Sequence, residues 1–97
     1  ETGKDLYIIV SKVTGTIKIG RSSNVQQRLL SLQTGNAYPL KLILLVENAG
    51  WREKEMHKKL KKFRTSGEWF LISGAHLIGD DLYSLIDLDA LYDFIGS

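Results

Sequence analysis

The feature that most constrains the fold is a pair of short apolar runs near the start of the chain, separated by a glycine turn. Residues 6–10 read Leu-Tyr-Ile-Ile-Val and residues 16–20 read Thr-Ile-Lys-Ile-Gly, with Thr14 and Gly15 between them. β-branched and aromatic residues favour strands, and a glycine between two such runs indicates a β-hairpin. The first run has no charged residue, so we expect a strand that is covered on both faces.

The rest of the chain alternates between helical and extended patterns. After the hairpin we expect a helix over residues 24–34, a strand over 40–46, a helix over 51–64, a short extended piece over 67–72 and a closing helix over 82–95. This order predicts an α+β fold, a small antiparallel three-stranded sheet flanked by helices, with an extra C-terminal helix. We expect a single domain over residues 4–97, and we interpret residues 1–3 as an expression remnant.

Composition excludes several classes of protein. Ninety-seven residues with 43% hydrophobic content fit one compact core. The chain has no cysteine, which excludes disulfide frameworks and thiolate metal sites. No apolar run approaches the roughly 18 residues that cross a bilayer, so we expect a soluble, intracellular protein.

The charges are unevenly distributed along the chain. Residues 1–64 hold all 13 Lys and Arg with five acids, a net charge of +8, whereas residues 65–97 hold six acids and no base. A basic body favours a polyanionic partner such as DNA, because clustered cations attract phosphate at long range. The alternative is that the lysines at 58, 59, 61 and 62 only solvate one helix face.

Three hairpin residues are expected to share a sheet face. If the hairpin loop has an even number of residues, Tyr7 lies on the same face as Lys18 and Gly20. A phenol and an ammonium beside a glycine could form the floor of a phosphodiester site. The alternative is that Tyr7 is a packed aromatic and Lys18 an ordinary exposed lysine.

Two arginines follow the hairpin. Arg21 comes at the end of the second run and Arg28 lies seven residues later on the first predicted helix, so we expect both to converge above the Tyr7 face. Guanidinium groups suit the charge that develops on a phosphate during hydrolysis. A surface arginine lying along the apolar edge of its helix is an equally good reading of Arg28.

The second predicted helix carries a candidate metal ligand. Glu53 and His57 are four residues apart and therefore lie on one helix face. A carboxylate is a good ligand for Mg²⁺ or Mn²⁺ in a phosphoryl-transfer site, so Glu53 is the metal candidate. His57 would support it as a general base or as a hydrogen-bond donor to the site. Both residues could instead be ordinary surface groups of the helix.

Taken together, four motifs resemble the GIY-YIG nuclease superfamily over about residues 5–70. The motifs are Leu6-Tyr7 with Lys18-Ile19-Gly20, then the R-L-x-x-L-Q-x-G segment from Arg28 to Gly35, then E-x-x-x-H from Glu53 to His57, and finally Gly67-Glu68-Trp69-Phe70. The chain is most similar to the phage, viral, fungal and bacterial branch that has K-I-G in place of Y-I-G. It departs from the family name at Asp5 and Leu6, where Gly-Ile is usual, and at Lys18, where the second tyrosine is usual.

The resemblance implies cleavage of DNA by water with one divalent ion, Mg²⁺ or Mn²⁺. By this analogy Tyr7 activates the water, Arg28 stabilises the phosphate charge, Glu53 holds the metal and Arg21 occupies a basic position. Because a lysine cannot act as a phenolate, either Tyr7 alone is the base or Lys18 lowers the pKa of Tyr7 or of the water.

Two other functions stay open at the level of sequence. One is a non-catalytic nucleic-acid-binding module that keeps the nuclease fold, and the other is a protein-interaction domain that uses the acidic segment from Asp80 to Asp93. Tyr7, Arg28 and Glu53 together favour the enzyme, because a binding module has no use for a metal carboxylate. A domain of this size has little surface for reading DNA sequence, so we expect specificity to come from DNA structure or from a further DNA-targeting domain or protein.

Overall fold

The computed structural model describes residues 3–77 together with residues 89, 93, 94 and 96. Its elements are β1 (Asp5–Ser11), β2 (Thr16–Ser22), α1 (Val25–Thr34), β3 (Leu40–Val46), η1 (Gly50–Arg52), α2 (Glu53–Lys59), η2 (Lys61–Phe63), β4 (Arg64–Ser66), β5 (Trp69–Leu71) and η3 (Ile72–Leu77), where η marks a 3₁₀ helix. None of the helices in this described part has the length and apolarity needed to span a bilayer.

The fold is α+β, as predicted, but its sheet is larger than predicted. The sheet has five antiparallel strands in the order β3-β1-β2-β5-β4, not three. The extra strands are the three-residue β4 and β5: β5 lies within the extended piece predicted over residues 67–72, and β4 lies just before it. The predicted closing helix over 82–95 lies outside the described residues, apart from 89, 93 and 94.

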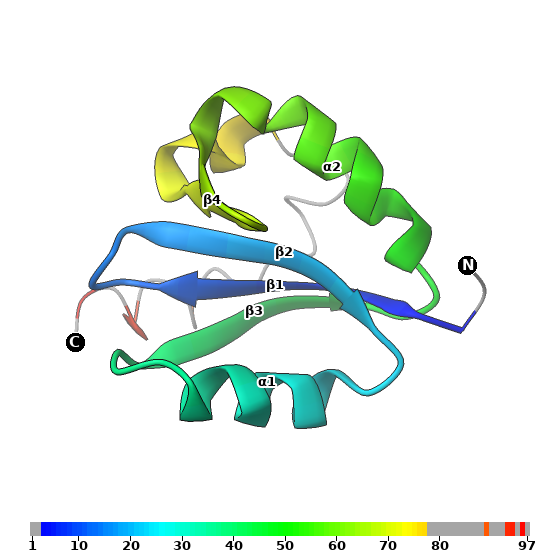
Figure 1. Ribbon diagram of the computed structural model, residues 1–97, viewed down its shortest axis with the longest axis horizontal. Helices are drawn as coiled ribbons and strands as arrows, with labels where there is room; N and C mark the ends of the chain where they lie inside the picture. Colours follow the sequence, from blue (N-terminus) through cyan, green and yellow to red (C-terminus); the bar gives the residue numbers. More distant parts are fainter. Residues whose placement is uncertain (1–2, 78–88, 90–92, 95, 97) are drawn as a thin grey trace.

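The central strand β1 is covered on both faces, as its unbroken apolar run predicted. Figure 1 shows α1 against one face of the sheet and α2 against the other. On the α2 face the even-numbered residues Leu6, Ile8 and Val10 join a core with Met56 and Leu60. On the α1 face Tyr7 and Ile9 pack with Val25 and with other apolar side chains of α1 and β3. The alternation of side chains along a strand therefore divides one sequence run between two cores.

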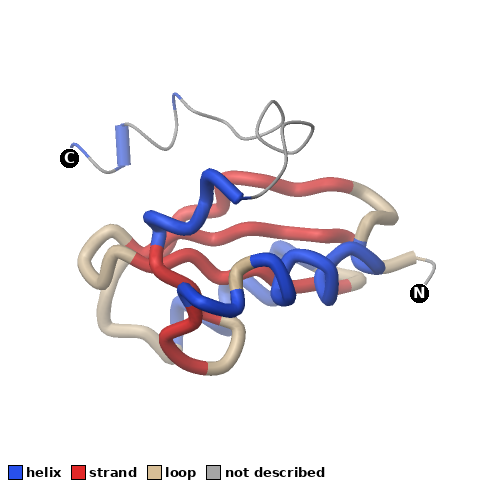
Figure 2. The backbone as a smooth tube through the Cα atoms, turned by 90° about the horizontal axis from the view of Figure 1, so that it is seen from above, coloured by secondary structure: helices blue, strands red, loops and turns tan. Residues whose placement is uncertain are grey.

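The second predicted helix is regular only in its middle. The predicted span 51–64 divides into η1, α2 and η2, and α2 itself covers seven residues. Met56 and Leu60 are buried, at 2% and 0% exposure, so the predicted apolar face is confirmed. Seen from above, these helices lie over the strands (Figure 2).

One edge of β2 is left open, and this opening positions the site. The short β5 pairs with β2 only at Thr16, Ile17 and Lys18. Beyond Lys18 the Ile19 N–H still donates to the Glu68 backbone oxygen at 3.3 Å, and from Gly20 to Ser22 the β2 backbone has β1 on one side and no described strand on the other. Side chains from the two faces of the sheet can approach each other past this open edge.

Candidate metal centre and its surroundings

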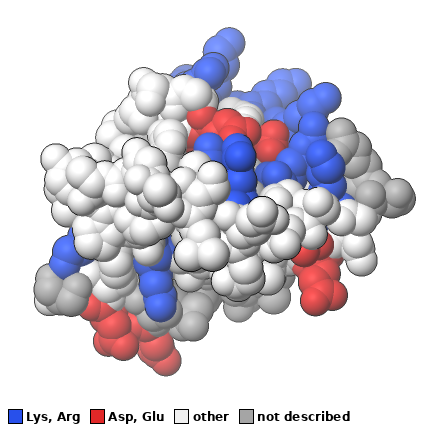
Figure 3. Space-filling view, turned by 60° about the horizontal axis from the view of Figure 1, so that its bottom comes forward, with Lys and Arg blue, Asp and Glu red and all other residues white. Residues whose placement is uncertain are grey.

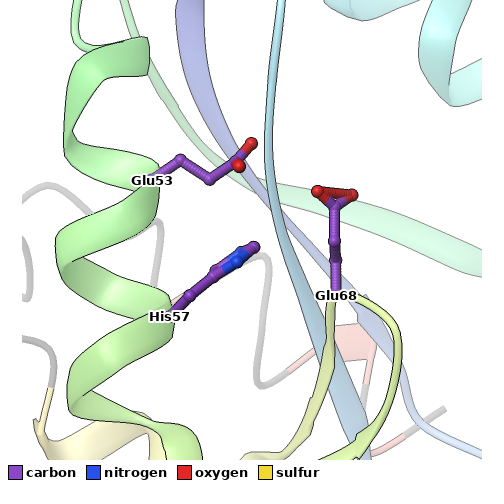
Figure 4. Close-up of side chains that lie close together, drawn as sticks. All are labelled: Glu53, His57 and Glu68. Atoms are coloured by element: carbon purple, nitrogen blue, oxygen red, sulfur yellow. The ribbon is translucent and has the colours of Figure 1, made fainter.

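Three potential metal ligands converge at the open edge of β2. Glu53 and His57 project from α2, and Glu68 projects from the turn before β5, so that they reach toward one another across β2 (Figure 4). One ligand atom from each lies within 4.8 Å of the others. We call this group the ligand trio. Glu53 was predicted as the metal ligand and His57 as its neighbour on the helix face, and the structure brings both to the same point.

The ring of His57 is held in a defined orientation. Its Nε2 lies 2.7 Å from the backbone oxygen of Ile19, and its ring centroid lies 5.1 Å from that of Phe70. A carbonyl oxygen can only accept a hydrogen bond, so Nε2 is the donor and Nδ1 is the nitrogen that keeps a free lone pair. A histidine that donates its other N–H to a backbone carbonyl is the usual arrangement around a bound metal.

Sequence reasoning missed Glu68 as a site residue and treated it only as part of a motif. Lys18 Nζ donates to Glu68 Oε1 at 2.9 Å, and the Lys18 side chain is only 8% exposed. Glu68 follows Gly67, whose φ of +54° is a left-handed conformation that glycine adopts without strain. The available signal was the G-E turn itself, but the 50-residue separation from Lys18 gave no local pattern to read.

Lys18 is therefore neither an exposed lysine nor a partner of the Tyr7 phenol. It is 6% exposed as a residue, and its ammonium lies 5.7 Å from the centroid of the Trp69 ring. The ion pair with Glu68 balances one of the two carboxylates of the ligand trio. Arg21 lies near the other carboxylate, with Nε 3.9 Å from Glu53 Oε2. These two cations offset the repulsion between the carboxylates before any metal binds.

The predicted shared face of Tyr7, Lys18 and Gly20 is confirmed. The hairpin loop has four residues, Tyr7 pairs with Gly20 and Ile9 pairs with Lys18. The Tyr7 ring lies directly over Gly20, where an added Cβ would lie 2.5 Å from the ring Cζ and would overlap the phenol oxygen. Gly20 is therefore required by the position of the Tyr7 ring.

Burial controls the ionisation of Tyr7. The residue is 1% exposed, and burial raises its pKa above the ordinary value because the phenolate would lose its hydration. Hydrogen bonding and charge from Arg28 partly offset this rise, while Glu68 and Glu53 add to it. The pKa of Tyr7 is therefore raised and not lowered, and the cation that acts on the phenol is Arg28 and not Lys18. The alternative, that Lys18 lowers the pKa of the attacking water, stays a prediction.

Arg21 and Arg28 were predicted to converge above the Tyr7 face, and this prediction is wrong. Arg28 comes from α1 and lies on the Tyr7 side, where it also lines a polar pocket of about 290 Å³ with Asn24 and Gln27. Arg21 pairs with Leu6, so its side chain leaves β2 toward the α2 face and Glu53. The strand alternation that joins Tyr7 to Gly20 necessarily directs Arg21 to the opposite face.

The ligand trio opens into a pocket that also carries cations. This pocket has a volume of about 400 Å³, and its lining includes the trio with Lys58, Lys61 and Arg64. We call it the metal pocket. Acidic side chains gathered among basic ones are visible on the surface in Figure 3. Carboxylates for a cation next to cations for an anion make a site suited to a metal and a phosphate together.

A family model described as the T5orf172 domain matches residues 6–92. No curated protein and no solved structure matches the chain.

Proposed function

The chain belongs to the T5orf172 domain family, a nucleic-acid-related family, and we propose that it is a metal-dependent DNA endonuclease of the GIY-YIG type that hydrolyses phosphodiester bonds. The observation that carries the proposal is the ligand trio, whose three ligand atoms lie within 4.8 Å of one another. It stands in a pocket with three cationic side chains, where a phosphodiester would find both a metal and positive charge.

The donor set of the trio fits a divalent ion. Two carboxylate oxygens and one imidazole nitrogen suit Mn²⁺, and Mg²⁺ would use mainly the carboxylates and water. The contact between His57 Nε2 and the Ile19 oxygen fixes the ring, and in the tautomer that donates through Nε2 the other nitrogen, Nδ1, would be the one to bind a metal. When bound, such an ion polarises a phosphoryl oxygen and lowers the pKa of its water.

The chain's own cations would hold the substrate. Lys58, Lys61 and Arg64 line the metal pocket and would draw the DNA backbone toward the trio. Arg28 contacts the phenol of Tyr7 from α1, and the charges of Glu53 and Glu68 act on the same phenol. From this position Arg28 would stabilise the negative charge that develops on the phosphate. Lys18 would act through Glu68, because their ion pair sets the position of that carboxylate.

Tyr7 would act as a neutral phenol and not as a phenolate base. Its raised pKa keeps the proton on the phenol throughout the physiological range. A neutral phenol held over Gly20 can orient Arg28 and a water molecule through hydrogen bonds, which is a positioning role.

Plasmid nicking tests the proposal. The chain is incubated with supercoiled plasmid at low salt in Mg²⁺, Mn²⁺ or EDTA, and Glu53→Ala is compared with Glu55→Ala. Glu55 is the matched control because it lies on the same helix but pairs with Arg52 and Lys59, at 3.9 and 3.4 Å. We expect nicking that requires metal, is lost in Glu53→Ala and persists in Glu55→Ala.

A non-catalytic nucleic-acid-binding module is the second candidate. The cations of the metal pocket favour it independently of any metal. If the chain bound DNA but cleaved it with neither Mg²⁺ nor Mn²⁺, and if Glu53→Ala bound DNA equally well, this second function would replace the nuclease proposal.

A further inference from the structure

A second pocket lies on the α1 side of the sheet, outside the site described above. It has a volume of about 380 Å³, within the range of roughly 300 to 1,000 Å³ typical of small-ligand sites. Its wall carries five hydroxyl side chains, from Ser11, Thr14, Thr16, Thr65 and Ser66. Asn36, Trp69 and Leu71 complete it, so none of the described residues that line it is charged. We call it the hydroxyl pocket.

One of its hydroxyls is buried and unpaired. Ser11 is 2% exposed, and its Oγ has no hydrogen-bond partner among the residues that the structure describes. Other polar groups of the wall already have partners: the hydroxyls of Thr14 and Thr16 bond each other at 2.7 Å, and that of Thr65 donates to the Trp69 oxygen at 3.2 Å. A buried hydroxyl without a partner is unfavourable, so Ser11 marks a place where a ligand group could bond.

Asn36 offers a second free group. Its Oδ1 accepts a hydrogen bond from the Tyr38 backbone N–H at 3.1 Å, which leaves the side-chain NH₂ available to a ligand. The pocket thus presents one hydroxyl, able to donate or accept, and one amide donor. These neutral groups suit the edge of a heterocyclic base and give no reason to expect a phosphate or a carboxylate.

Trp69 supplies the flat wall and joins this pocket to the ligand trio. It pairs with Lys18 across β2 and β5, so its half-buried indole lies on the same sheet face as Lys18 and the pocket. The Lys18 ammonium contacts both Glu68 and Trp69: its Nζ lies 2.9 Å from Glu68 Oε1 and 5.7 Å from the centroid of the Trp69 ring.

The distance along β2 from the hydroxyl pocket to the Tyr7 and Gly20 pair is also short. Thr16 in the pocket wall lies four residues from Gly20, about 13 Å at the usual rise per residue. That is about four nucleotides at the stacked spacing of about 3.4 Å, and fewer in an extended strand. A broad uncharged area beside a group of mixed charges is visible on this side of the molecule (Figure 3).

We propose that the hydroxyl pocket binds an unpaired nucleobase of the DNA strand being cleaved, stacked on Trp69 and hydrogen-bonded by Ser11 and Asn36. The inference rests on the proposed nuclease function and names its substrate class. A base in a duplex is stacked on both sides and paired on its edge, so it cannot enter a pocket lined by donors and an indole. The preferred substrate is therefore DNA that is single-stranded within a few nucleotides of the scissile bond.

The test measures binding in EDTA, where no cleavage occurs. Fluorescence anisotropy compares a labelled single-stranded oligothymidylate with a duplex of the same length, for the parent chain, Trp69→Ala and Trp51→Ala. Trp51 is the matched control because it is 60% exposed on η1 and lines neither pocket. Stacking of one base on an aromatic ring corresponds to about a tenfold change in affinity or more, so we expect Trp69→Ala to lose that much on the single strand and little on the duplex.

A second measurement keeps the fold intact. The chain has two tryptophans, so in Trp51→Phe the fluorescence reports Trp69 alone. Oligothymidylate should quench this fluorescence, and Ser11→Ala should weaken the quenching. Unchanged fluorescence, or equal affinity of parent and Trp69→Ala for the single strand, would overturn the inference.

The two proposals fail separately. Trp69-dependent binding by a chain that never nicks DNA would remove the nuclease function and leave the base pocket. If Trp69→Ala cleaved single-stranded DNA with metal at the rate of the parent chain, the nuclease function would stand and the base-binding role of the hydroxyl pocket would be refuted.

Discussion

Replacing Gly20 with alanine should destabilise the protein through a single contact with Tyr7. The added Cβ would lie 2.5 Å from Tyr7 Cζ and 3.0 Å from Cε2. The Tyr7 ring is 1% exposed and packs with Ile9 and Val25, so it has little room to move aside. The clash is therefore with a ring fixed in a core and not with a flexible side chain.

The magnitude follows from two opposing effects. Forcing extra volume into a packed core costs about 1–3 kcal/mol. The φ of Gly20 lies outside the left-handed region, so alanine fits the backbone and gains about 0.4–1 kcal/mol by restricting the unfolded chain. The net loss should be about 1–2 kcal/mol. At a urea m value of about 1–2 kcal/mol per molar, the unfolding midpoint falls by about 1 M.

A double-mutant cycle with Tyr7→Leu isolates the clash. Urea unfolding is followed by circular dichroism for the parent, Gly20→Ala, Tyr7→Leu and the double variant. Because leucine lacks the ring atoms above Gly20, the alanine should cost little in that background, giving a coupling of about 1 kcal/mol or more. Strictly additive effects, or a Gly20→Ala chain as stable as the parent, would refute the reasoning.

Three further outcomes follow from the site and its helices. Lys18→Met should tighten Mn²⁺ binding several-fold in calorimetry, because Glu68 loses its competing cation; unchanged or weaker binding would contradict this. Tyr7→Phe should slow plasmid nicking by about tenfold at every pH between about 6 and 9, because the raised pKa keeps the Tyr7 phenol neutral over this range. If the substitution instead abolished the pH dependence of the nicking rate, Tyr7 would be identified as the base. Asn24→Ala should cost about 0.5–2 kcal/mol in urea unfolding, because Asn24 Oδ1 caps α1 by accepting from Gln27 N at 3.1 Å, and a loss near zero would show that the cap is dispensable.

The parts of the fold that the sequence predicted are those with a long periodic pattern. The hairpin, α1 and β3 each carry seven or more patterned residues, and their ranges agree with the prediction within two residues at each end. The register of the hairpin followed from the even loop, and it correctly placed Tyr7, Lys18 and Gly20 on one face.

Of the two short strands, β5 falls within the extended piece predicted over residues 67–72, whereas β4 was not predicted. β4 and β5 have three residues each, which is too few for an alternating pattern to be recognised. β4 is exposed throughout, so it carries no apolar signal at all. β5 pairs with β2, which is a contact between distant parts of the chain, and β4 joins the sheet only through β5.

The sequence predicted two residues of the candidate site and missed the third. Glu53 and His57 share a helix turn, so their spacing alone indicated one face. Glu68 joins them only because β5 pairs with β2 and brings the Gly67 turn beside Lys18. A local sequence pattern cannot reveal a ligand that depends on a long-range pairing.

Direct measurement of metal binding tests the central claim, that Glu53, His57 and Glu68 form one metal site. Isothermal titration of Mn²⁺ into the metal-free chain is compared for the parent, Glu53→Gln, Glu68→Gln and the control Glu55→Gln. The structure predicts one ion per chain, with affinity reduced about tenfold or more by loss of either trio carboxylate and unchanged by Glu55→Gln. Binding that is insensitive to Glu68, or equally sensitive to Glu55, would contradict the account.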